Sequence, residues 1–208
     1  MKIISINVGV PQSQTYGGQI VFTAGHKTPV PEAMLHLTNF DGDRQADLKN
    51  HGGPDKAVCV YSFDHYPHWE EWFGDQLSPG AFSENLTISG LSENEVCIGD
   101  VFILGEAVAQ ITQPRQPCSK LAGKRGRKDL AKAIHENGYS GFYLRVLKEG
   151  LVRAGDSFEL TTRHPAAVTV SFANSVMYKH RADPDSLHRL LSVPELSAVW
   201  RETLSQRI

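Results

Sequence analysis

The segment Gln113-Pro114-Arg115-Gln116-Pro117-Cys118 places a thiol three residues after a guanidinium, on a stretch that holds two prolines. Proline fixes φ, removes a backbone donor and restricts the residue before it. We therefore expect a stiff loop that holds Arg115 and Cys118 in one geometry. A nearby cation favours the thiolate that both a nucleophile and a metal ligand require. A lone cysteine is more often a small buried residue, but the surroundings of Cys118 favour chemistry.

Three other short segments carry groups that suit ligand binding. In His51-Gly52-Gly53-Pro54-Asp55-Lys56, two glycines let the backbone approach a ligand, although an ordinary polar turn has the same composition. Lys27 and Thr28 pair a cation with a hydroxyl, which suits a phosphate but also occurs in solvated loops. Asn85 precedes an apolar strand and can donate to or accept from a bound ring, or simply form a turn.

His65 and His68 form a His-x-x-His pair on a predicted helix, which is a partial zinc motif. No third ligand follows at a fixed spacing, so structural or solvent-facing histidines are favoured. The chain has no GxGxxG turn, no G-x-S-x-G elbow and no cysteine cluster for an iron–sulfur centre. A redox enzyme built on this chain would therefore take its electrons from another protein.

The elements that must position these groups are mainly short strands. Runs rich in β-branched and aromatic residues predict strands at 3–8, 19–23, 56–61, 101–104, 107–112, 142–147 and 157–161. Gly-Asp turns recur between them, which favours a closed or strongly bent sheet. Two helices interrupt the strands. Asp64 is the expected cap of the first, and the second spans 129–137 with Gly138 as its stop.

The composition changes near residue 165, where the strands end and three helical patterns begin. The first carries Phe172 and Val176, and the second opens at Asp183-Pro184. Ser192 and Glu195 form a capping-box signature for the third. We expect an α+β, mainly β chain, with a β domain at 1–164 and a three-helix module at 165–208. Three helices invite a helix-turn-helix interpretation, but their mixed charge disfavours DNA binding.

Composition narrows the class of protein. The chain has 208 residues, with 21 Lys and Arg against 23 Asp and Glu, so nucleic acid is not an electrostatically favoured partner. Its three cysteines are odd in number and widely spaced, which favours a reducing compartment. The N-terminus lacks a signal-peptide pattern, and no apolar run approaches the ~20 residues of a membrane helix. We expect a cytoplasmic globular protein.

Taken together, four segments resemble the MOSC family, whose domains are related to the C-terminal part of molybdenum cofactor sulfurase. They are residues 41–47, 51–56, 82–86 and 113–118. The three-helix tail indicates the YiiM-like subgroup, and the resemblance covers nearly the whole chain. One departure is Ser83, where the family usually has glycine.

The resemblance implies a β-barrel-like domain that binds molybdenum through a molybdopterin. Cys118 matches the family cysteine whose thiolate coordinates the metal, in agreement with the softness of thiolate ligands. Arg115, Lys27 and Thr28 would hold the phosphate or dithiolene side, and His51 and Asn85 would lie near the pterin or the substrate as further catalytic residues. The other cofactor-binding candidates are Arg44, Gln113, Tyr143 and Arg145, the last two of which alternation places on one face of their strand.

The first function that this resemblance implies is a molybdenum-dependent reductase of N-hydroxylated compounds such as hydroxylaminopurines, hydroxylamines and amidoximes. Its electrons would come from a separate flavoprotein or similar donor. The alternative is a carrier or sulfur-transfer module for the cofactor, without turnover. A third hypothesis is a cysteine hydrolase that uses Cys118 with His51. The tail has three open roles, namely docking a redox partner, covering the active site and forming a homodimer.

Overall fold

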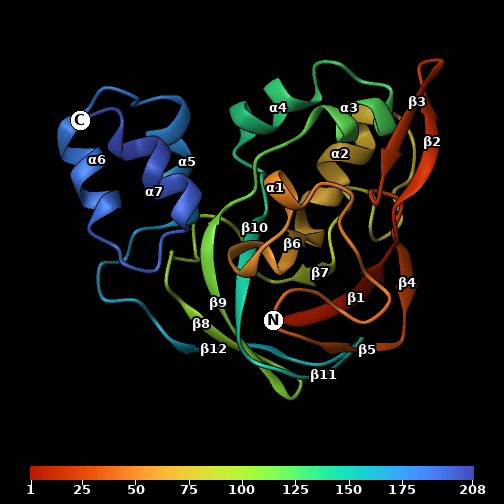
Figure 1. The fold of residues 1–208 in the computed structure, drawn as a ribbon, viewed down its shortest axis with the longest axis horizontal. Coiled ribbons are helices and arrows are strands. Elements are labelled where there is room, and N and C mark those ends of the chain that lie inside the picture. The colour runs from red at the N-terminus through yellow and green to blue at the C-terminus, as the bar shows by residue number, and fades with distance from the viewer.

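A bent sheet of eight strands forms the centre of the molecule in the computed structural model, which describes residues 1–208 apart from the side chains of residues 49 and 50 (Figure 1). All neighbouring strands are antiparallel except β6 and β7. Two further sheets of two strands each, β5 with β11 and β2 with β3, are separate from it. In spatial order the sheet contains β12 (Phe158–Thr162), β8 (Val101–Leu104), β9 (Ala107–Pro114), β10 (Phe142–Lys148), β6 (Val58–Ser62), β7 (Leu86–Ser89), β1 (Lys2–Val8) and β4 (Thr28–Val30).

The α+β, mainly β prediction is confirmed, but the sheet does not close into a barrel. Its hydrogen-bonded order ends at β12 and β4. Register shifts in the β1–β7, β9–β10 and β8–β12 pairs increase the bend, as bulges do. The bend brings the start of β1 against the turn before β12, where Lys2 bridges Ser157 and the Ile3 N–H donates to the Asp156 carbonyl at 2.9 Å. The described strands therefore form a strongly bent sheet whose two edge strands, β12 and β4, do not pair with each other.

The predicted strands are present, with shifted ends. The strand expected to end at Thr112 continues to Pro114, because Pro114 still pairs with Phe142 across the ladder. The strand expected from residue 56 begins at Val58, after a 3-10 turn at Pro54–Lys56. Strands that were not predicted are short and mostly polar or flanked by turns: β2 (Gln12–Tyr16), β4, β5 (Glu32–Leu35) and β11 (Gly150–Arg153). Strand β3 (Gln19–Thr23) lies as expected, and β7 is the strand expected after Asn85.

Four helices pack around the upper end of the sheet in Figure 1: α1 (Leu48–His51), α2 (Tyr66–Phe73), α3 (Ser119–Arg125) and α4 (Leu130–Asn137). The predicted Asp64 cap is wrong, because the Ser62 hydroxyl accepts from the Asp64 N–H and opens the preceding 3-10 turn (Phe63–His65). The Asp64 carboxylate instead accepts from the Gly90 N–H at 2.8 Å. Helix α4 begins after Asp129 and ends at Gly138 as expected.

The C-terminal helices are α5 (Val170–Tyr178), α6 (Pro184–Leu191) and α7 (Ala198–Ser205). Helix α7 is capped by Ser197, whose hydroxyl accepts from the Trp200 N–H, and not by the predicted Ser192 capping box. Buried residues such as Val176 and Trp200 belong to the same apolar cluster as the sheet. The Ser197 N–H also donates to the Thr112 carbonyl at 3.1 Å, which fixes the start of α7 to β9. Of the helices described, none has the length and apolar character needed to cross a membrane.

Candidate functional site

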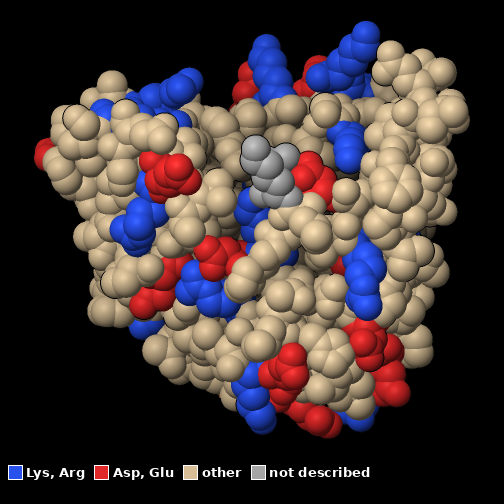
Figure 2. Space-filling model, in the orientation of Figure 1, with Lys and Arg blue, Asp and Glu red and all other residues tan. Residues whose placement is uncertain are grey.

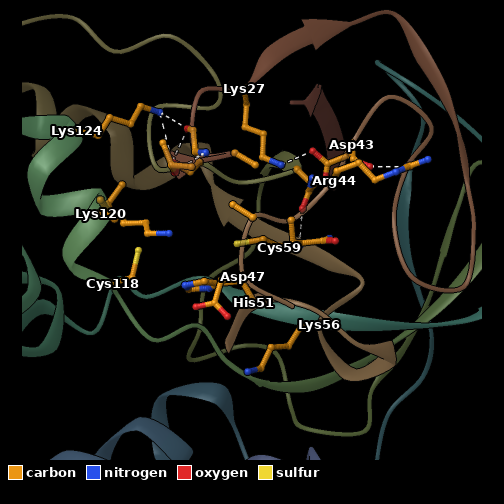
Figure 3. Close-up of a pocket in the computed structure, with 18 of the residues that line it drawn as sticks. Lys27, Asp43, Arg44, Asp47, His51, Lys56, Cys59, Cys118, Lys120 and Lys124 are labelled. Atoms are coloured by element: carbon orange, nitrogen blue, oxygen red, sulfur yellow. Dashed lines mark hydrogen bonds and ion pairs between the residues drawn. The ribbon is translucent and has the colours of Figure 1, made fainter. Parts of the chain in front are cut away.

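A pocket opens beside the N-terminus of α3, and Cys118 lies on its wall directly before that helix (Figure 3). Burial alone would raise the pKa of the Cys118 thiol. A hydrogen bond from the His51 side chain, the charge of Arg115 and the nearby Leu121 N–H outweigh burial and lower this pKa to about 7. Cys118 is thus substantially a thiolate near neutral pH, which suits either a nucleophile or a metal ligand.

The predicted pairing of Arg115 with Cys118 holds in space, because both residues line the pocket. Arg115 is only 5% exposed, and its Nη1 has no hydrogen-bond partner among the described residues. A buried guanidinium nitrogen without an acceptor is costly. This orphan donor indicates that an anionic or acceptor-bearing ligand belongs in the pocket.

Lysines and a further arginine extend the positive charge around the same pocket. Blue side chains gather at the hollow in the middle of the face shown in Figure 2. Lys27 pairs with the buried carboxylate of Asp43, and Arg44 donates to the Asp43 carbonyl at 2.7 Å. The Lys124 ammonium donates to the carbonyls of Gly25 and Gly80 at 2.9 and 3.0 Å. Burial, reinforced by neighbouring cations, lowers the pKa of Lys124 to about 8.

Asn85 lines the pocket but is held by the protein itself. Its Oδ1 accepts from the Cys59 N–H at 3.1 Å, and its Nδ2 donates to Asp43 Oδ2 at 2.9 Å. Because Asp43 also pairs with Lys27, Asn85 positions the charged wall of the pocket. Cys59 lines the pocket too, and burial raises the pKa of its thiol to about 11.

Two of the predicted cofactor residues lie away from the pocket. Thr28 is exposed in β4, the edge strand of the sheet, and lines neither cavity. Arg145 forms an ion pair with Asp55, with Nε 2.9 Å from Oδ1, and lines neither cavity. Alternation along β10 predicted that Tyr143 and Arg145 share one face of the strand. Tyr143 lines the pocket, but the Arg145 guanidinium is paired with the carboxylate of Asp55.

Gln113 lines a second cavity, which also reaches Cys118. It is buried, and its Oε1 has no hydrogen-bond partner among the described side chains. His51, Lys56 and Tyr143 line this cavity and the first one as well.

The His-x-x-His pair is structural, as favoured. His65 is buried, stacks on Tyr139 and lies 2.8 Å from Glu93 Oε2, while His68 is hydrogen-bonded to Asn137. Within the part of the chain that the structure describes, no group of three His, Cys, Asp or Glu side chains is arranged to hold a metal ion. Any metal at this site would therefore need ligands beyond the protein, in addition to Cys118.

Several pocket residues were not predicted. Lys120 and Lys124 both follow Cys118 and are four residues apart, which places them on one face of α3. That spacing was the available signal, but no apolar stripe marks α3 as a helix. Asp43 and Thr23 also line the pocket, and only tertiary contacts bring them there.

The fold and the site define an α+β protein with a low-pKa thiol in a cationic ligand pocket. The sequence matches the MOSC domain over residues 47–159 and the YiiM-like 3-alpha helix domain over residues 168–208. The chain belongs to the MOSC domain family, with a YiiM-like three-helix domain after it.

Three similar proteins give this assignment its context. The uncharacterized protein YflK of Bacillus subtilis is 49% identical over 207 residues, which cover 99% of this chain and 94% of YflK. The crystal structure of YiiM from Geobacillus stearothermophilus has a TM-score of 0.85 at 40% identity and covers 99% of this chain and 98% of its own. A protein named reductase from Gibberella moniliformis is 33% identical over 168 residues, which are 77% of this chain but only 29% of the reductase.

Proposed function

We propose that this chain is a molybdenum-cofactor-dependent oxidoreductase that reduces N-hydroxylated small molecules with electrons from a separate donor protein. The observation that carries the proposal is the low-pKa thiol of Cys118 in the same cationic pocket as Arg115, whose buried Nη1 has no hydrogen-bond partner among the described residues. The family and its reductase-named relative agree with this chemistry.

The pocket fits the cofactor by the chemistry of its donors. A thiolate is a soft ligand that suits molybdenum bound to sulfur, and Cys118 is the thiol that environment ionises near neutrality. Arg115, Lys27 and Lys124 offer charge-assisted donors for a phosphate-bearing pterin. When bound, the cofactor supplies two-electron redox chemistry, which the chain's own side chains lack.

The remaining roles belong to residues of this chain. His51 donates a hydrogen bond to Cys118, so it holds a proton next to the reacting centre. Asn85 and Asp43 fix Lys27 on the opposite wall. The overall reaction converts R–NHOH, two electrons and two protons into R–NH₂ and water. The N–O bond breaks, its oxygen leaves as water, and the external donor supplies both electrons.

The first test is the molybdenum and pterin content of protein purified from a host that makes the cofactor. Near-stoichiometric metal and pterin are expected in the wild type. Cys118→Ala should lose most of the metal, whereas Cys97→Ala should retain it, because Cys97 is a buried thiol that lines neither cavity. A wild-type protein without metal or pterin, from cells in which another molybdoenzyme loads normally, would contradict the proposal.

Turnover is tested on the loaded protein with a chemical reductant in place of the donor. Benzamidoxime and 6-hydroxylaminopurine should reoxidise the reduced protein and appear as the amidine and the amine. A loaded protein that accepts electrons but is not reoxidised by either compound would indicate a cofactor carrier instead.

The Cys118–His51 hydrogen bond also favours a second candidate, a thiol hydrolase. This function predicts an acyl-enzyme burst with activated esters in metal-free protein, lost in both Cys118→Ala and His51→Ala. A burst together with absent metal would replace the reductase proposal.

A further inference from the structure

Cys118 lies where two cavities meet. The first has a volume of about 100 Å³ and the second about 350 Å³. The second volume lies in the range of small-molecule sites, roughly 300–1,000 Å³. The residues that line both cavities are Asp47, His51, Lys56, Cys118, Lys120 and Tyr143.

The walls that the two cavities do not share differ in charge. The first cavity alone holds Lys27, Arg44, Arg115 and Lys124 against the single carboxylate of Asp43. The second cavity alone holds Gln113, Gln116, Pro117, Ser119 and Val199, none of which is charged. An anionic group is therefore favoured in the first cavity. In the second cavity the negative charges of Asp47 and the Cys118 thiolate balance the positive charges of Lys56 and Lys120, so an uncharged molecule is favoured there.

The uncharged wall includes the three-helix tail. Val199 of α7 lines the second cavity and is 47% exposed. Two backbone N–H groups anchor the start of this helix, because the Ser197 N–H donates to the Thr112 carbonyl and the Ala198 N–H donates to Asp55 Oδ2 at 2.9 Å. Gln116, which also lines the second cavity, donates to the Tyr178 hydroxyl of α5 at 3.1 Å. The three-helix tail and the loop that carries Cys118 are thus joined by hydrogen bonds, and together they enclose the second cavity.

A buried acceptor gives the second cavity a hydrogen-bonding preference. Gln113 Oε1 is unpaired among the described residues, while its Nε2 donates to the Pro114 carbonyl at 3.1 Å. An amide oxygen accepts from N–H and O–H groups. Hydroxylamino and amidoxime groups carry both of these donors and are uncharged near neutral pH.

We propose that the second cavity is the substrate chamber, that it takes uncharged molecules with N–H or O–H donors, and that Val199 of the tail limits their size. The identity of the substrate rests on the proposed reductase function. The access route to Cys118 past Val199 is independent of the reductase function, so it is tested separately in cofactor-free protein.

The test measures how fast Cys118 reacts with two uncharged thiol reagents, N-ethylmaleimide and the bulkier N-(1-pyrenyl)maleimide, with the modified site identified by peptide mass. Val199→Trp should slow the pyrenyl reagent about tenfold, the size of a steric effect in a binding pocket, and the ethyl reagent much less. Glu202→Trp is the matched control, because Glu202 is exposed on the same helix and does not line the cavity. It should react like the wild type.

Equal slowing by Val199→Trp and Glu202→Trp, or slowing by Arg44→Trp in place of Val199→Trp, would overturn the proposed route. Thermal melts of each variant show whether it folds, and both helix positions are exposed enough for a tryptophan to be accommodated. In the loaded enzyme, Val199→Trp should raise KM for a bulky amidoxime with kcat and molybdenum content unchanged. Altered thiol access without turnover of any N-hydroxylated compound would retain the chamber and reject the reductase function.

Discussion

At the scale of single residues, environment separates two thiols that line the same pocket. Burial raises the pKa of Cys59 to about 11, whereas His51 and Arg115 reverse the effect of burial at Cys118 and lower its pKa to about 7. The sequence predicted a reactive thiol at Cys118, because the guanidinium of Arg115 is only three residues away in the chain. The contribution of His51 depends on a contact across 67 positions of sequence, which only the fold creates.

The two pKa values predict the pH dependence of alkylation in cofactor-free protein. Only the thiolate reacts, so the rate at Cys118 with iodoacetamide should rise with pH and reach half of its plateau at about pH 7, while Cys59 stays unmodified. Removing the hydrogen bond in His51→Ala should raise the Cys118 pKa and slow the reaction at neutral pH, with little effect on the plateau. Peptide mass spectrometry follows each thiol. An unchanged midpoint in His51→Ala would contradict this account.

Lys124 predicts a pH-dependent affinity for anions. Its pKa is lowered to about 8, so its charge is lost as the pH rises through that value. In Cys118→Ala protein, which lacks the thiolate's own titration, pyrophosphate affinity should fall roughly tenfold above pH 8, as expected for the loss of a charged hydrogen bond. Lys124→Met should bind weakly at low pH and lack this fall. Lys128→Met is the control, because Lys128 is exposed and lies outside the pocket, and this variant should retain the fall in affinity above pH 8. Isothermal titration calorimetry measures the affinities.

At the scale of elements, the turn before β7 holds one wall of the pocket in a strained conformation. Ser83 has φ of 64°, a region that favours glycine, and its hydroxyl donates to the Gly25 carbonyl at 2.7 Å. Lys124 donates to carbonyls on both sides of this contact, at Gly25 and Gly80. The serine thus holds a turn conformation that favours glycine, and its hydrogen bond offsets part of the strain.

This conformation reverses the usual order of alanine and glycine. Ser83→Ala loses the hydrogen bond and keeps the strain, so it should lower the free energy of unfolding by about 1 kcal/mol. Ser83→Gly loses the bond but relieves the strain, and should be more stable than Ser83→Ala by about 1 kcal/mol. At Ser175, inside α5, glycine should instead be the less stable of the two. Urea unfolding tests both pairs, and the same order at both positions would refute the strain argument.

At the scale of the whole molecule, Asp55 joins the sheet to the tail. Its Oδ1 pairs with Arg145 of β10, and its Oδ2 accepts from the Ala198 N–H at the start of α7. The apolar faces of the tail helices lie in the same core cluster as the sheet. The chain therefore packs as one continuous body around the two cavities.

Asp55→Ala should loosen this junction. It leaves a partly buried guanidinium and the first N–H of α7 without their acceptor, so the free energy of unfolding should fall by roughly 2 kcal/mol. Hydrogen exchange at residues 198–200 should accelerate more than in α2. The control is Glu32→Ala, because Glu32 pairs with Arg153 at the exposed surface and such pairs contribute about 0.5 kcal/mol. Equal losses in the two variants would show that Asp55 does not link sheet and tail.

The sequence by itself determined the class of fold, most strand positions, the change to helices near residue 165 and the Arg115–Cys118 pair. These features depend on local periodicity, on turn residues and on groups three positions apart, all of which are encoded in short stretches of chain. The family resemblance added the pterin-binding expectation for Lys27, Asn85 and Tyr143, which line the pocket.

Tertiary structure alone decided the rest. It left Thr28 exposed at the edge of the sheet and paired Arg145 with Asp55. It also placed His51 within hydrogen-bonding distance of Cys118 and Val199 in the wall of the second cavity. It also left the sheet bent but open. Side-chain partners, burial and pKa depend on atoms that are distant in the chain, and no local pattern specifies which of several suitable partners a folded backbone brings within reach.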